Sequence, residues 1–246
     1  MKIDTSQREP GVKEKHLCLY HHLGMGDAVE CNGMVRHFAE KYDTVTVFAK
    51  EIYYDACCFM YRDTPKIKVT NLPGRGHAIN ASARSFIKGH KGDVLIPGYE
   101  NFRKIEFKKK GYGPGEGFYH LAGIPWKYRN EKFYVERDLQ KEEETFLSLN
   151  PKKEKFIFIH DDIRRGFKIK VNTNLKIIRN DPTKDFFSML GVLSRAKEIH
   201  CMSSSFLCLV DCMHEQFRDK KKYLHNTRRV FIGKNTLRSN WVKRGS

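Results

Sequence analysis

The chain has 246 residues, 40% of them hydrophobic, which is typical of a globular protein with one large or two small domains. No apolar run approaches the roughly 18 residues that a membrane span needs, and residues 1–15 are polar and charged, unlike a secretory signal. Lysine and arginine total 46 against 29 acidic residues, and a formal net charge of +17 attracts nucleic acid, acidic lipid headgroups or phosphorylated small molecules. We therefore expect a soluble cytoplasmic protein with no transmembrane segment, and peripheral contact with a membrane stays open.

The seven cysteines and eleven histidines form no recognisable metal-binding pattern. The sequence contains no Cys-x-x-Cys pair and no His-Glu-x-x-His spacing, so no zinc site of a common type is predicted. Buried free thiols in a reducing compartment account best for the cysteines.

Strands and helices alternate in the first part of the chain. Short apolar runs predict the strands, and apolar residues at three- and four-residue spacing predict the helices. The strands are expected at residues 16–20, 45–49, 67–69 and 94–96, and the helices at 27–39 and 53–61. This order predicts a doubly wound α/β unit with parallel strands.

The middle of the chain, from Asn71 to Gly117, is rich in glycine and gives a weaker signal. The segment Gly111–Gly117 holds four glycines and is expected to form a loop, either a mobile connector or a place of close ligand approach. A short helix is predicted at 118–122, a charged amphipathic helix at 142–149, and a linker at 150–153.

A second α/β pattern follows the linker. Its strands are expected at 156–159, 176–179, 198–202 and 221–225, and its helices at 186–196 and 206–213. The simplest architecture is two Rossmann-like halves, residues 15–150 and 151–246, whose parallel sheets face each other across a cleft. Ligands of such sheets bind outside the carboxyl ends of the strands.

The turn Gly24-Met25-Gly26-Asp27 between the first strand and the first helix is the first candidate site. Gly24 and Gly26 permit a tight turn, and the helix N–H groups that follow face any anion there. A dinucleotide fingerprint needs a third glycine where Val29 stands, and an acidic residue where Lys50 follows the second strand, so NAD and FAD are not expected. Asp27 is either a helix cap or a general base for an acceptor hydroxyl.

The second candidate is Ser203-Ser204-Ser205, between a predicted strand and a helix. Hydroxyl groups and helix N–H groups at such a turn can hold a diphosphate, although a single capping serine gives the same pattern. In the same half, His160, Asp161, Asp162, Arg164 and Arg165 follow a buried strand. The arginines suit phosphate oxygens, and the two carboxylates could instead hold a divalent ion.

Several of these segments resemble a known family. Leu23–Ala28 and Asn32–Arg36 resemble the opening of GT-B-fold glycosyltransferases similar to the lipopolysaccharide heptosyltransferases. The segment from Ile199 to Asp211 is similar to the donor-side strand, turn and helix of that group, which more often has Asp-Thr/Ser-Gly where this chain has three serines. Phe118–Gly123 and Phe133–Asp138 resemble the region between the domains in small glycosyltransferases of bacterial polysaccharide clusters and large DNA viruses.

The resemblance implies a compact GT-B enzyme whose N-terminal half binds the acceptor and whose C-terminal half binds a nucleoside-diphosphate sugar. Asp27 would be the general base of an inverting, metal-independent transfer of a hexosyl or deoxyhexosyl group to a glycan or glycoprotein. The residues expected at the donor are Gly24, Gly26, His160, Asp162, Arg164, Arg165, Ser203, Ser204 and Ser205. No cofactor and no specific nucleic acid are implied.

Two other interpretations stay open. A GT-A-type, metal-dependent glycosyltransferase would use Asp161 and Asp162 to hold the ion, although these residues come late in the chain. A nucleic-acid-binding α/β protein would account for the net charge, but it would require a basic stripe with interleaved aromatic residues.

Overall fold

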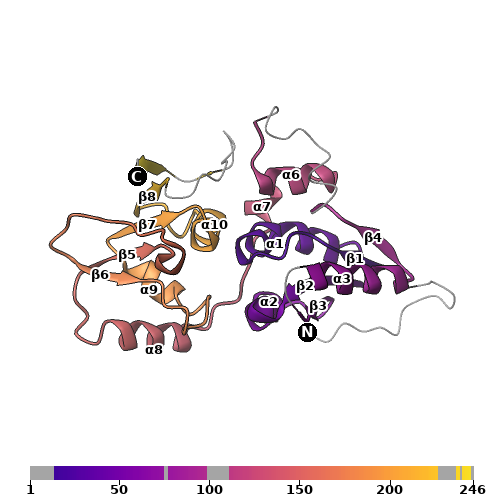
Figure 1. Cartoon of the computed structure of the whole chain (residues 1–246), viewed down its shortest axis with the longest axis horizontal. Helices are drawn as coiled ribbons and strands as arrows, with labels where there is room; N and C mark the ends of the chain where they lie inside the picture. The colour runs from indigo at the N-terminus through magenta and orange to yellow at the C-terminus, as the bar shows by residue number, and fades with distance from the viewer. Residues whose placement is uncertain (1–13, 75–76, 99–110, 227–236, 239, 245–246) are drawn as a thin grey trace.

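The structure of the protein is a computed structural model, and it describes residues 14–74, 77–98, 111–226, 237–238 and 240–244. Two parallel β-sheets, each covered by helices, lie on opposite sides of a pair of packed helices (Figure 1). The prediction of an α/β protein built from two Rossmann-like halves is confirmed.

The first sheet has the order β3-β2-β1-β4, and all its strands are parallel. Its central strand β1 is apolar because a parallel strand between two neighbours is covered on both faces, and Leu17, Cys18 and Leu19 are at most 2% exposed. Its elements are β1 (His16–Leu19), α1 (Met25–Ala39), β2 (Thr44–Lys50), η2 (Glu51–Tyr53), α2 (Tyr54–Tyr61), β3 (Ile67–Leu72), α3 (His77–Gly89) and β4 (Asp93–Leu95).

The second sheet has the order β6-β5-β7-β8-β9, again with parallel pairing throughout. Strand β5 is buried along its whole length, in agreement with its apolar sequence. The elements are β5 (Phe156–His160), η3 (Ile163–Arg165), β6 (Lys176–Arg179), α9 (Leu190–Arg195), β7 (Glu198–Met202), α10 (Ser205–Cys212), β8 (Lys221–His225) and β9 (Trp241–Arg244).

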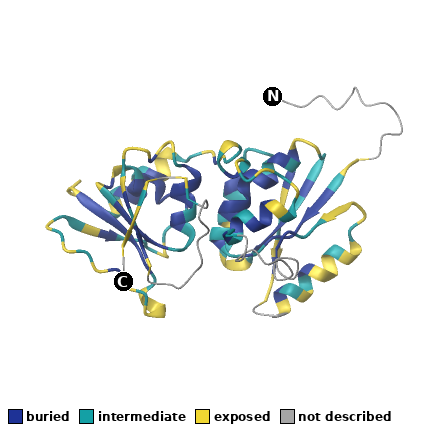
Figure 2. Ribbon diagram, turned by 90° about the horizontal axis from the view of Figure 1, so that it is seen from above, coloured by how far each residue is buried: buried dark blue, intermediate teal, exposed yellow. Residues whose placement is uncertain are grey.

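Between the two sheets, the described residues 111–155 form the helices α6 (Pro114–Leu121), α7 (Tyr128–Glu131) and α8 (Leu139–Leu149). Between the sheets, α1 packs against α10, and one apolar core continues from β1 through these helices to β8. Figure 2 shows that the strands and the central helices are largely buried, whereas the exposed residues lie at the periphery. The two halves are therefore joined by a packed interface as well as by the chain.

The structure corrects three expectations about individual elements. The glycine-rich loop ends at Gly113, and α6 begins at Pro114, because proline suits the first helical position. Helix α3 occupies part of the middle segment for which no helix was predicted. Strand β9 follows β8, so residues 221–225 are not the last strand. No helix in the described ranges is long and apolar enough to cross a membrane.

Candidate functional site

A cleft of about 880 Å³ opens where the two halves meet. One wall comes from the first half: Met25, Ile52, Tyr53, Asp55 and Ala56. The other wall comes from the segments that follow the carboxyl ends of β5, β6 and β7, which is where ligands of parallel sheets bind. The predicted residues that line it are His160, Asp161, Asp162, Arg164, Arg165, Ser204 and Ser205.

The glycine turn and the serine turn meet at this cleft. A Cβ atom added at Gly26 would lie 3.4 Å from both the Cα of Ser205 and the Sγ of Cys208, so the two helix starts are in van der Waals contact there. Gly24 and Gly26 themselves are not part of the cleft wall, but Met25 between them is. The first turns of α1 and α10 therefore lie side by side at one end of the cleft.

Asp27 lies in the first turn of α1 and is half-buried. Its carboxylate accepts a hydrogen bond from the N–H of Gly24, the N-cap residue, in the manner of the acidic partner of a capping box. Burial, and then the nearby charge of Glu30, raise the pKa of Asp27 from 3.8 to about 7. Asp27 thus supports the N-terminus of α1 through Gly24 and has a raised pKa, and it does not itself line the cleft wall.

The start of α10 has no side-chain cap. Ser204 is the N-cap residue, its side chain makes no capping hydrogen bond, and the first turn of the helix has no acidic residue. Ser204 and Ser205 line the cleft, so this helix start, which has no side-chain cap, lies at the cleft. Ser203, half-buried, follows β7 directly and lies outside the cleft wall.

The acidic residues after β5 are already held by arginines. Asp161 is buried, forms an ion pair with Arg179, and accepts a hydrogen bond of 2.9 Å from the N–H of Ile169. Asp162 caps η3 and pairs with Arg165. In the part of the chain that the structure describes, no group of three His, Cys, Asp or Glu residues is placed to hold a metal ion.

The arginines beside these carboxylates lie at the cleft surface. Arg164 and Arg165 belong to η3, line the cleft and are exposed, and Arg165 is paired with Asp162. The ring of His160, in contrast, is buried edge-to-face on Phe206, with the centroids 4.8 Å apart. Arg164 and Arg165 are therefore more exposed at the cleft than His160 is.

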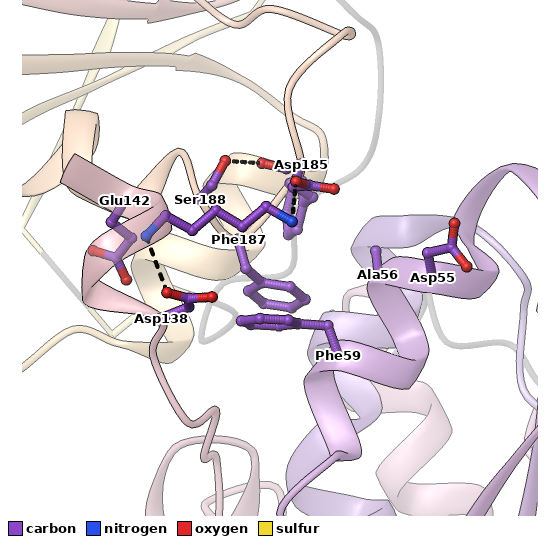
Figure 3. A pocket seen from close by; sticks show the side chains of 10 residues that line it. Asp55, Ala56, Phe59, Asp138, Glu142, Asp185, Phe187 and Ser188 are labelled. Carbon is purple, nitrogen blue, oxygen red and sulfur yellow. Dashed lines mark hydrogen bonds and ion pairs between the residues drawn. The ribbon is translucent and has the colours of Figure 1, made fainter. Parts of the chain in front are cut away.

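A side pocket of about 120 Å³ adjoins the cleft and shares Asp55, Ala56, Asp185 and Phe186 with it. Figure 3 shows its floor, where Phe59 of α2 stacks on Phe187 of the second half, with ring centroids 5.4 Å apart. Its remaining lining residues are Asp138, Lys141, Glu142 and Ser188. The ring pair provides a second contact between the halves, at the opposite end of α2 from the cleft.

A buried charged cluster was not predicted from the sequence; we call it the Arg129 cluster, and it consists of Glu30, Arg129 and Asp211. Arg129 is 0% exposed and joins Asp211 of α10, at 2.7 Å, to Glu30 of α1, at 3.1 Å. No local pattern could have found it, because Arg129 lies in a charged stretch that looks like a solvated helix face.

The comparisons with known proteins concern the fold. No family model matches the chain, and no curated protein matches it. Among solved structures, the chain is similar to a glycosyl transferase of family 9 from Veillonella parvula DSM 2008, with a TM-score of 0.59, 11% identity, and coverage of 94% of this chain and 86% of that one. It is also similar to E. coli ADP-heptose LPS heptosyltransferase II, with a TM-score of 0.55, 9% identity, and coverage of 94% and 90%.

A third similar structure is the iron-containing dodecameric glycosyltransferase TibC from enterotoxigenic E. coli H10407, with a TM-score of 0.51 and 8% identity. The match covers 87% of this chain and 58% of TibC. At such identities the likeness is one of fold. The chain therefore has a GT-B-type fold, similar to that of the heptosyltransferases.

Proposed function

We propose that this protein is a glycosyltransferase that moves a sugar from a nucleoside diphosphate to a hydroxyl group of a glycan or glycoprotein acceptor. The fold supports the proposal, because the similar solved structures are glycosyltransferases. The observation that carries it is the contact between Gly26 and Ser205, which brings an acidic helix start next to an uncapped helix start at one cleft.

The donor would bind to the C-terminal half, residues 151–246. Its diphosphate would lie at the first turn of α10, where the hydroxyl groups of Ser204 and Ser205 and the N–H groups of the helix can donate hydrogen bonds. Arg164 and Arg165 would neutralise the charge that grows on the leaving diphosphate, so the transfer needs no metal ion.

The acceptor would bind to the N-terminal half, residues 15–150. Asp27 would accept the proton of the acceptor hydroxyl group as its oxygen attacks the anomeric carbon and the bond to the diphosphate breaks. A carboxylate whose pKa is about 7 is a stronger base than an ordinary aspartate and is still largely ionised slightly above neutral pH. One displacement without a covalent intermediate inverts the anomeric configuration.

Replacing Asp27 tests this mechanism. Asp27→Asn should lower turnover by at least about 100-fold, the usual range for loss of a general base, while donor affinity stays within about twofold. Donor affinity is measured by calorimetry and turnover by release of the nucleoside diphosphate.

Glu116→Gln is a matched control. Glu116 has the same place after Gly113 that Asp27 has after Gly24, and it accepts the same kind of backbone hydrogen bond. It lies on α6, which contributes no residue to the cleft wall, whereas Asp27 lies on α1 two residues after Met25, which lines it. The control should retain turnover. Substantial turnover by Asp27→Asn would remove Asp27 from the base role.

A further inference from the structure

The Arg129 cluster fixes the carboxylate of Glu30 at the interface of three helices. The guanidinium of Arg129 is shared between Glu30 Oε1 and Asp211 Oδ2. Asp211 also accepts hydrogen bonds from the Nε1 of Trp241, at 3.0 Å, and from the N–H of Arg238, at 3.1 Å. The hydrogen-bond acceptors of Asp211 are thus satisfied by Arg129, Arg238 and Trp241, and they do not depend on Glu30.

The other oxygen of Glu30 faces α6. A Cβ atom at Gly115 would lie 1.9 Å from Glu30 Oε2, which means that the backbone of α6 approaches the carboxylate as closely as only glycine permits. The carboxylate of Glu30 is therefore held between Arg129 and the backbone of α6 at Gly115.

That position lies one helical turn from Asp27, since residues three apart on a helix are neighbours on its surface. The other groups that face Asp27 are Lys50 at the end of β2, Cys31 on α1 and Cys208 on α10. Burial raises the pKa of both thiols, so they are neutral at physiological pH. Glu30 and Lys50 are therefore the full charges among these groups, and they act in opposite directions.

We propose that Glu30, held in place by Arg129, is a positioning residue that sets the proton affinity of Asp27 and so the pH at which the base works. The inference rests on the proposed role of Asp27, and it concerns how that role is tuned. Removal of the buried negative charge should make Asp27 easier to ionise and a weaker base.

The direct test is titration of the Asp27 carboxyl group by carbon-13 NMR in the full chain and in Glu30→Gln. Glutamine has nearly the same shape as glutamate and keeps an oxygen that accepts from Arg129. The midpoint of the Asp27 titration should fall by roughly 0.5–1.5 pH units. The acid limb of kcat/KM should move down by the same amount.

Asp63→Asn is the matched control for the fold. Asp63 pairs at 2.8 Å with Arg36, which lies on α1 like Glu30 but away from α10. This variant should lower the melting temperature and leave the titration of Asp27 where it is. A shift of equal size in Asp63→Asn would mean that any disturbance of α1 moves the titration, and it would overturn the proposal.

Lys50→Gln supplies a second variant that leaves the buried cluster intact, because Lys50 is partly exposed at the end of its strand. It should move the Asp27 titration upward, opposite to Glu30→Gln. Unchanged midpoints in both variants would overturn electrostatic control of Asp27.

The titration needs no turnover, so the two proposals fail separately. If Asp27→Asn retains activity, the base role is wrong whatever the midpoint. If Asp27→Asn is inactive and Glu30→Gln titrates like the parent chain, the base role stands and the role of Glu30 is wrong.

Discussion

At the scale of single residues, Asp27 shows what sequence patterns can and cannot predict. The order strand, Gly-x-Gly-Asp, helix is local, and it placed Asp27 in the first turn of α1. The properties that make it a candidate base come from burial, from Glu30 on the next turn of α1 and from Lys50 on another element, and the local pattern does not contain them. The cluster of Glu30, Arg129 and Asp211 was not predictable for the same reason.

Two buried histidines on adjacent strands predict a loss of stability in acid. His200 Nδ1 lies 2.9 Å from His225 Nε2, and Tyr223, Glu198 and Arg244 surround the pair. Burial, and then the charges of His200 and Arg244, lower the pKa of His225 from 6.5 to about 4, and burial also lowers the pKa of His200. His225 takes up a proton below pH 6.5 in the unfolded chain but only near pH 4 in the folded chain. The free energy of unfolding therefore falls as the pH drops through this window.

Urea unfolding at pH 7.5 and pH 5 measures this effect. The parent chain should lose about 1–3 kcal/mol more than His225→Gln between the two pH values. His120→Gln, at an exposed position of α6, is the control and should behave like the parent. Equal losses in the parent and His225→Gln would contradict the prediction.

At the scale of elements, the strands were the most predictable, because a buried parallel strand has a short run of apolar residues. Phe156–His160 and Glu198–Met202 are examples. The glycines of α6 gave a wrong prediction of a loop, and the reason is physical. Gly115 is required by the close approach of Glu30, not by a turn, and a local pattern cannot distinguish the two. Strand β9 is short and largely exposed, so its sequence has little apolar signal.

The open start of α10 predicts unequal costs for two N-cap substitutions. Asp138 caps α8 by accepting a hydrogen bond of 3.0 Å from the N–H of Lys141, whereas Ser204 makes no such bond at α10. Asp138→Ala should therefore lower the free energy of unfolding by about 1 kcal/mol, and Ser204→Ala by less than about 0.5 kcal/mol.

The two substitutions should have the opposite order of effects on ligand binding, with Ser204→Ala the more harmful. Ser204→Ala should weaken the binding of a nucleoside diphosphate, because it removes a donor that faces the cleft, and Asp138→Ala should leave it unchanged. Calorimetry of both variants gives the affinities, and urea unfolding gives the stabilities. If Ser204→Ala costs as much stability as Asp138→Ala and binds normally, the serine serves the fold and not the ligand.

At the scale of the whole molecule, the two halves were predictable from the repeated alternation of strands and helices. Their mutual placement was not, because it depends on α1 packing on α10 through Gly26 and on the stacking of Phe59 on Phe187. These contacts bring an acidic turn from one half to an uncapped helix start of the other. A donor bound between them would have its diphosphate on one half and its anomeric carbon near the other.

The most direct test of this account is a thermal-shift panel of nucleoside diphosphates and their sugars, measured on the full chain in EDTA and with manganese. A matching nucleotide at 100 times its dissociation constant should raise the melting temperature by roughly 5–10 °C, and it should do so in EDTA. Stabilisation that appears only with manganese, or no stabilisation by any nucleotide of the panel, would contradict the proposal of a metal-independent transferase.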